Sequence, residues 1–129
     1  PDSHLWTSAG VLEPVRKSWA TGTPLRWSRV NNLPDYAYFD PAVHVTNGVP
    51  CQACHGRIDR MPLTRKAEPL TMEFCVSCHR DPAPRLRPKE AVFAMGWTTD
   101  QSRKELGHYL MTANGIDTRN LTDCSTCHR

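Results

Sequence analysis

Three copies of one pentapeptide organise the sequence: Cys51-Gln-Ala-Cys54-His55, Cys75-Val-Ser-Cys78-His79 and Cys124-Ser-Thr-Cys127-His128. Together they use all six cysteines of the chain. Each copy has the form C-x-x-C-H, the attachment signature of c-type haem. Two thiols three residues apart on one helical turn reach the two vinyl groups of one porphyrin, and the following histidine reaches the iron as proximal ligand. The spacing therefore predicts three haems, each held covalently by two thioethers.

Zinc and disulfides are the alternative uses of such cysteines. Twenty residues separate Cys54 from Cys75, which is at the upper limit of the spacing in a four-cysteine zinc site. That assignment leaves Cys124 and Cys127 without partners and treats the three following histidines as coincidence. Disulfides within C-x-x-C pairs are strained and easily reduced, so a disulfide framework explains the pattern no better.

Three histidines remain after the proximal set, His4, His44 and His108, which equals the number needed for bis-histidine ligation of three haems. His44 lies between Val43 and Val45, where a buried imidazole needs a partner, and iron is the best one available. The alternative is a core histidine. His108 falls on an expected helix and is otherwise an exposed helix residue. His4 lies in a terminal arm, where disorder is common.

Methionine can replace imidazole as the distal ligand and raises the reduction potential. Met72 lies three residues before Cys75, Met61 follows the first motif, and Met95 precedes Gly96-Trp97, but each also suits packing against a porphyrin edge. No nucleophile–base pair, nucleotide loop or paired-carboxylate pattern is present, so catalysis would need an iron with an open position. The rival to an electron carrier is thus a haem enzyme acting on a small inorganic substrate.

The composition favours one small domain whose centre is filled by something other than side chains. Only 39% of the 129 residues are hydrophobic, and eleven are proline. We expect a mainly irregular fold with a few short α-helices, little β-structure and a core dominated by haem. Residues 1–40 are expected to form an extended N-terminal arm that packs on the haem core, and residues 41–129 the trihaem domain. Trp6, Trp19 and Trp27 of the arm pack either on the body of the protein or against a porphyrin face.

The formal charge of +3 does not indicate nucleic-acid binding, because haem propionates would offset it. The basic residues are expected on a solvated face, with some pairing to propionates. No apolar run approaches the roughly 18 residues that span a membrane. The chain begins at Pro1 rather than Met, which indicates a processed or truncated form. The basic residues in question are Arg26, Arg29, Arg57, Arg60, Arg65, Lys66, Arg85, Arg87 and Lys89.

Capping and turn residues place the expected helices. A short helix is expected around 11–20, and Asn47-Gly48 is a turn. Further helices are expected over 51–55 with Pro50 in its first turn, over 72–79 capped by Thr71, over 100–113, and over 124–128 capped by Thr122. The proline-rich stretch 82–88 is expected to be an extended connector.

Between Tyr38 and Pro82 the sequence resembles a known family. The matching residues run Phe39-x-x-x-x-His44-Val45, Gly48-Val49-x-Cys51-x-x-Cys54-His55-Gly56-Arg57-x-Asp59-x-Met61 and Leu70-x-Met72-x-x-Cys75-x-x-Cys78-His79-Arg80. They are similar to the cytochrome c3/c7-like subunits that accompany alternative complex III, a membrane quinol:electron-acceptor oxidoreductase, and its molybdopterin-oxidoreductase-like iron–sulfur subunit. The similarity continues through Glu13-Pro14-Val15-Arg16, Leu33-Pro34-Asp35, Arg87-Pro88, Met95 and Leu121-Thr122-x-Cys124.

The resemblance implies electron transfer in a periplasmic or other extracytoplasmic compartment, at a membrane surface. It implies an iron–sulfur or quinol-oxidising module upstream and a small cytochrome or oxidase downstream. The family usually shows Phe-x-His-x-x-His before the first haem, with two distal ligands on one strand-like segment. Here the second histidine is His44, but the first position is Pro41, which cannot bind iron. One haem therefore takes His4, His108 or a methionine, or stays five-coordinate. The family's pentahaem members carry more haems, so this chain is a short relative or one part of a longer arrangement.

Overall fold

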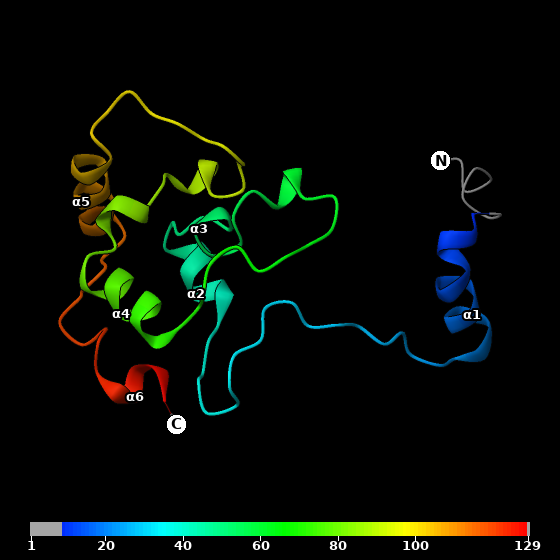
Figure 1. Ribbon diagram of the computed structural model, residues 1–129. Helices are drawn as coiled ribbons and strands as arrows, with labels where there is room; N and C mark the ends of the chain where they lie inside the picture. The colour runs from blue at the N-terminus through cyan, green and yellow to red at the C-terminus, as the bar shows by residue number, and fades with distance from the viewer. Residues whose placement is uncertain (1–8, 129) are drawn as a thin grey trace.

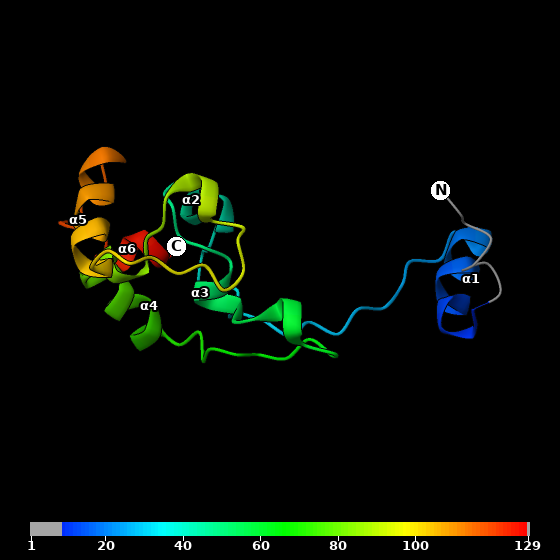
Figure 2. The ribbon, with the colours of Figure 1, turned by 90° about the horizontal axis from the view of Figure 1, so that it is seen from above.

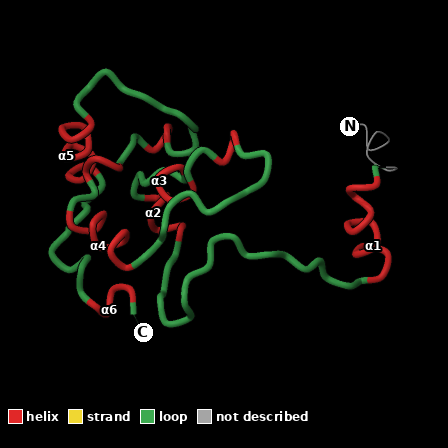
Figure 3. Tube along the Cα trace, in the orientation of Figure 1, coloured by secondary structure: helices red, strands yellow, loops and turns green. Residues whose placement is uncertain are grey.

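The computed structural model describes residues 9–128 and shows short helices joined by long loops (Figure 3). No strand forms among these residues; a single isolated antiparallel bridge joins Ala37 to His128. The expected fold class is confirmed. The α-helices are α1 (Glu13–Thr21), α2 (Pro41–Thr46), α3 (Gln52–His55), α4 (Met72–Arg80), α5 (Arg103–Ala113) and α6 (Cys124–Cys127), and the 3₁₀-helices are η2 (Gly10–Leu12), η3 (Ile58–Arg60), η4 (Ala83–Arg85) and η5 (Lys89–Ala91). No helix in this part of the chain is long and apolar enough to cross a bilayer.

Side-chain caps begin three of the helices, α2, α4 and α5. The Thr71 hydroxyl accepts a hydrogen bond from the Phe74 amide at 3.4 Å, which starts α4 where the sequence predicted. The Ser102 hydroxyl does the same at the start of α5, so this helix begins at Arg103 rather than at residue 100. The last helix is preceded by Asp123, not by the expected cap Thr122, and no side chain caps it. Caps satisfy amide groups that have no partner within the helix.

The N-terminal arm divides into two parts. Its helix α1, which confirms the helix expected around 11–20, lies well away from the other helices in both ribbon views (Figures 1 and 2). An extended segment joins it to the body, and Trp19 and Trp27 are 91% and 80% exposed. The end of the arm, by contrast, contacts the body, since the Tyr38 amide donates to the Cys127 carbonyl at 2.7 Å. Packing of Trp19 and Trp27 on haem stays a prediction, and Trp6 lies outside the described residues.

The small protein core lies where an extended connector was expected. Ala83, Leu86 and Val92 are at most 2% exposed, and the proline-rich stretch forms the 3₁₀-helix η4 against α5. Gly107 permits this packing, because a Cβ atom there would overlap the Ala83 carbonyl group. The expectation of an extended connector was wrong for Ala83–Arg85, whereas Leu86 has extended backbone. Prolines fit the first turn of a 3₁₀-helix, and burial of the apolar residues between them stabilises the packed turn.

Candidate haem-binding site

Each C-x-x-C-H motif lies on a short helix, as the sequence predicted. The first motif spans α3, with Cys51 at its N-cap; the second lies within α4; the third spans α6 and ends at His128. In Figure 1 these helices gather in the body of the molecule with α2 and α5, away from α1. All six cysteines are unbridged thiols, so both sulfur atoms of every motif are available for thioether formation.

The three motifs are brought close to one another. Burial raises the pKa of the Cys54 thiol, and the nearby Cys78 and Cys75 add to this effect. Burial likewise raises the pKa of Cys75, with a further contribution from Cys127. Such electrostatic effects act only over short distances in a protein. The first motif therefore lies beside the second, and the second beside the third.

The proximal histidines are oriented through their Nδ1 atoms. Nδ1 of His79 lies 2.8 Å from the Leu121 carbonyl oxygen, and Nδ1 of His128 lies 3.2 Å from the Tyr36 carbonyl oxygen. A carbonyl can only accept, so Nδ1 carries the hydrogen in both rings and Nε2 keeps a free lone pair. This arrangement of outer contacts is typical of histidines that bind a metal through Nε2.

His44 has the same arrangement although it belongs to no attachment motif. Its Nδ1 lies 2.9 Å from the Asp40 carbonyl oxygen, and its ring packs on Phe39 with centroids 4.7 Å apart. The centroid of its ring lies 6.0 Å from that of His79, with 24° between the ring planes. Two imidazoles that bind one metal ion from opposite sides, at metal–nitrogen bonds of about 2.0 Å, place their centroids roughly 6 Å apart. The spacing of the two rings fits a bis-histidine pair.

Pro41 has a structural role at the position where the resembled family carries a histidine. It occupies the first turn of α2, where its fixed φ angle suits a helix and its missing N–H costs nothing. The preceding residue, Asp40, caps the helix by accepting from the Ala42 amide at 2.8 Å. The segment implied to be strand-like is therefore a helix, and α2 presents His44 from its last turn.

The other expected distal ligands are more scattered. His108 lies on α5 with an exposed side chain, and no ring contact joins it to another described imidazole. Met72 is 67% exposed, whereas Met61 and Met95 are half-buried. His4 lies outside the described residues. Among the described residues, a ring contact places His44 beside a proximal histidine, and ligation by the other residues stays a prediction.

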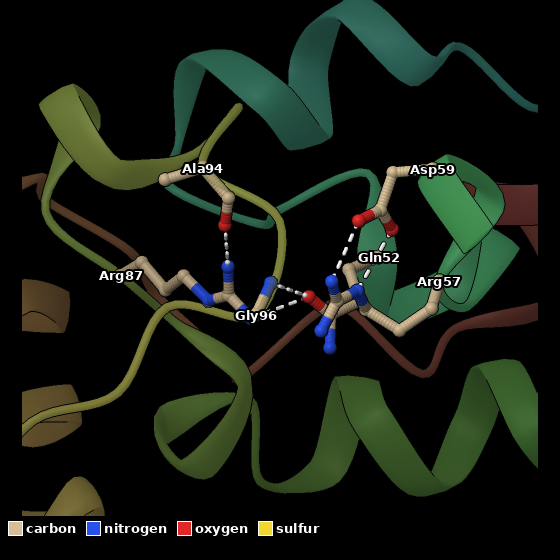
Figure 4. Close-up of polar contacts among 6 residues, drawn as sticks. All are labelled: Gln52, Arg57, Asp59, Arg87, Ala94 and Gly96. Atoms are coloured by element: carbon tan, nitrogen blue, oxygen red, sulfur yellow. Dashed lines mark hydrogen bonds and ion pairs between the residues drawn. The ribbon is translucent and has the colours of Figure 1, made fainter.

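Arg87 and Gln52 support the first motif and were missed as site residues. The Gln52 side-chain oxygen accepts from the Gly96 amide at 2.7 Å and from Arg87 Nη2 at 3.4 Å, and Arg87 Nη1 donates to the Ala94 carbonyl at 2.8 Å (Figure 4). Arg87 is only 3% exposed, so the expected solvated face was wrong for this residue. Burial lowers its pKa, and the charge of Arg103 lowers it further.

The chain around Arg87 also explains the glycine at the predicted turn. The Arg87 amide donates to the Gly48 carbonyl at 2.9 Å, and a Cβ atom on Gly48 would lie 2.7 Å from the Arg87 carbonyl oxygen. The φ angle of Gly48 is +89°, which favours glycine. The only sequence signal for a buried Arg87 is its position between Leu86 and Pro88.

Two further observations concern the neighbourhood of the motifs. Arg57 pairs with Asp59 at 2.6 Å just after the first motif, an exposed contact also seen in Figure 4. This pairing lowers the pKa of Asp59 through the hydrogen bond from the guanidinium. Within residues 9–128, no three side chains of His, Cys, Asp or Glu converge as a metal site.

Paired thiols on three short helices, with imidazoles held through Nδ1 beside them, fit covalent haem and define a multihaem c-type cytochrome. The sequence profile of the family described as cytochrome c7 and related cytochrome c matches residues 37–129, and the chain belongs to this family. No curated protein matches the chain. Membership confirms the resemblance at the level of a c7-like multihaem cytochrome.

The family establishes the general function of the chain. Cytochromes of the c7 type carry covalent c-type haem and transfer electrons, so the chain is a multihaem electron carrier. Members are extracytoplasmic, which agrees with the expected compartment. That these proteins are carriers also agrees with the expectation that the chain is not itself an enzyme.

Proposed function

We propose that the chain binds three haems and relays electrons along them, from a quinol-oxidising or iron–sulfur module of a membrane complex to a downstream acceptor. The observation that carries this proposal is the proximity of the motifs. Arg85 donates to the Ala53 carbonyl of the first motif and lies over the Phe74 ring of α4, which carries the second. Nδ1 of His79 in the second motif lies 2.8 Å from the Leu121 carbonyl oxygen, just before the third. A thioether at each sulfur would keep successive porphyrins close together, with the second motif between the other two.

The residues of this chain hold each haem and orient its iron ligand. Each pair of cysteines would anchor one porphyrin, and Nε2 of His55, His79 and His128 would provide the proximal ligands. Nε2 of His44 would bind opposite His79, because the two rings lie 6.0 Å apart. A bound haem supplies a one-electron couple between ferric and ferrous iron. The backbone carbonyls at Nδ1 of His44, His79 and His128 keep these rings in place during that change, which limits the reorganisation that accompanies electron transfer.

Haem stoichiometry and spin state test this proposal directly. A pyridine haemochrome assay and the intact mass should both report three haems per chain, none of them extractable by acid acetone. The electron paramagnetic resonance spectrum of the oxidised protein should be dominated by low-spin haem. Two haems with one free C-x-x-C pair would refute the trihaem assignment. Tight carbon monoxide binding to one haem of the reduced protein would instead favour a haem enzyme with an open iron.

The physiological partners follow from the resemblance around the first two motifs. It supports a periplasmic position at the membrane surface, next to a complex of the alternative complex III type, with a small cytochrome or oxidase as acceptor. Membranes that contain such a complex should reduce the purified cytochrome when quinol is added, at a rate that rises with the concentration of the complex. Reduction at the same rate by quinol alone would contradict this assignment.

A further inference from the structure

Asn31 contacts the proximal histidine of the first motif from the end of the N-terminal arm. Its side-chain Nδ2 lies 3.1 Å from Nδ1 of His55, although the two are 24 positions apart in sequence. The other amide atom of Asn31, Oδ1, is buried and has no hydrogen-bond partner among residues 9–128. A buried polar atom without a partner is costly and needs an explanation.

The contact has the wrong chemistry for an iron ligand in this amide orientation. An NH₂ group can only donate, so Nδ1 of His55 would accept and Nε2 would carry the ring hydrogen. An imidazole protonated on Nε2 cannot offer that atom to iron. His44, His79 and His128, by contrast, all meet a carbonyl oxygen at Nδ1, which leaves Nε2 free.

A half-turn of the Asn31 amide gives Nδ1 of His55 an acceptor, while the NH₂ group takes the buried position that Oδ1 held. It exchanges Oδ1 and Nδ2, so that Oδ1 lies beside Nδ1 of His55 and accepts its hydrogen. His55 then gains the same tautomer as the other three histidines. The side chain of Asn31 thereby does for His55 what backbone carbonyls do elsewhere.

We propose that Asn31 is the positioning residue of the first haem: its Oδ1 accepts from His55 Nδ1, orients the ring and lowers the reduction potential of that iron. An acceptor at Nδ1 makes an imidazole a stronger electron donor, which favours ferric iron. A side-chain acceptor, unlike a backbone carbonyl, can be altered by substitution. The inference assumes that a haem is bound at the first motif, as proposed above.

Two substitutions at Asn31 and two at its neighbour form the test. Asn31→Leu removes the acceptor, and Asn31→Asp replaces it with a stronger, charged one of the same shape. Asn32 is exposed and has no such contact, so Asn32→Leu and Asn32→Asp are the matched controls. The mass of each purified protein gives its haem content, and spectroelectrochemical titration resolves its potentials.

We expect one potential to rise in Asn31→Leu and the same one to fall in Asn31→Asp. Loss of an outer contact commonly changes a metal site by about tenfold or more, and a tenfold change in a one-electron equilibrium corresponds to about 59 mV. Asn32→Leu should match the wild type. Potentials of Asn31→Leu equal to those of Asn32→Leu would overturn the inference.

A carboxylate lowers the potential of a nearby iron by its charge alone, so the Asn31→Asp shift is compared with that of Asn32→Asp. A larger fall in Asn31→Asp supports an acceptor at Nδ1, whereas an equal shift or a rise would overturn the inference. Should Asn31→Leu accumulate poorly, this comparison decides the question. A wild-type protein without haem at the first motif would refute the proposed function itself, whereas full haem content with unshifted potentials refutes only the role of Asn31.

Discussion

Replacing His44 by alanine removes an imidazole whose ring centroid lies 6.0 Å from that of His79. If His44 is the distal ligand of the second haem, that iron loses its sixth ligand. With three haems per chain, about a third of the total iron should then change from low-spin to high-spin. The reduced variant should also bind one equivalent of carbon monoxide per chain, and one reduction potential should rise.

The side chain of His44 interacts with few other groups of the protein, so its removal should leave the haem content unchanged. Nδ1 is hydrogen-bonded to the Asp40 carbonyl at 2.9 Å, and the ring packs on Phe39 with centroids 4.7 Å apart. A hydrogen bond contributes about 1 kcal/mol and an aromatic pair about 0.5–1.5 kcal/mol. The free energy of unfolding should therefore fall by about 2 kcal/mol, which does not release a haem that is held by thioether bonds.

Magnetic circular dichroism of the oxidised variant and carbon monoxide titration of the reduced variant make the measurement. His108→Ala is the control, because this exposed residue on α5 shows no ring contact with His79. A low-spin spectrum in His44→Ala that matches the wild type would refute ligation by His44 and leave it a core histidine. A high-spin component in His108→Ala would show that α5 also supplies a ligand, contrary to the exposed position of that side chain.

Three further predictions concern the scaffold and its surface. Gly107→Ala should lower the free energy of unfolding by about 1–3 kcal/mol, because its Cβ atom would overlap the Ala83 carbonyl. Gly10→Ala, which has open space around the new Cβ atom, should leave the free energy of unfolding unchanged. Equal thermal midpoints for the two variants would contradict the packing at Gly107. Thr71→Ala should cost about 1 kcal/mol through removal of the cap of α4, and an unchanged denaturant midpoint would exclude the cap. The Arg119 guanidinium lowers the pKa of Asp117 to about 2 through its hydrogen bond to the carboxylate. Arg119→Leu should therefore raise the pKa of Asp117, measured by following the carboxyl titration with nuclear magnetic resonance. In the wild type, the ion pair is present above the ordinary carboxyl pKa and is lost as the pH falls through about 2.

Local signals in the sequence predicted the elements that carry the haem motifs. The spacing of Cys75, Cys78 and His79 needs only one turn of helix, and a cap such as Thr71 acts within four residues. These interactions are short-range, so the sequence pattern states them directly. At the third motif the expected cap, Thr122, was off by one residue: Asp123 precedes the helix and its side chain makes no capping hydrogen bond, and one residue is the usual precision of such signals.

Burial was harder to predict from the same patterns. The stretch 82–88 looks extended because of its prolines, yet it is buried against α5, and Arg87 within it is almost fully covered. That outcome depends on Gly107, which lies two dozen residues away from Ala83 and alone allows the close approach. A charged residue in a proline-rich stretch is ordinarily exposed, and only partners from other segments, here Gln52 and Ala94, make its burial tolerable.

The sequence by itself determined the attachment chemistry, because thioether and proximal bonds involve residues within five positions of one another. Tertiary structure alone decided which imidazoles come together: His44 approaches His79 across 35 positions, and Asn31 approaches His55 across 24. It also decided that Pro41 starts a helix whose last turn presents His44. Contacts between distant segments depend on the packing of the whole chain, so the spacing of residues within a motif does not predict them.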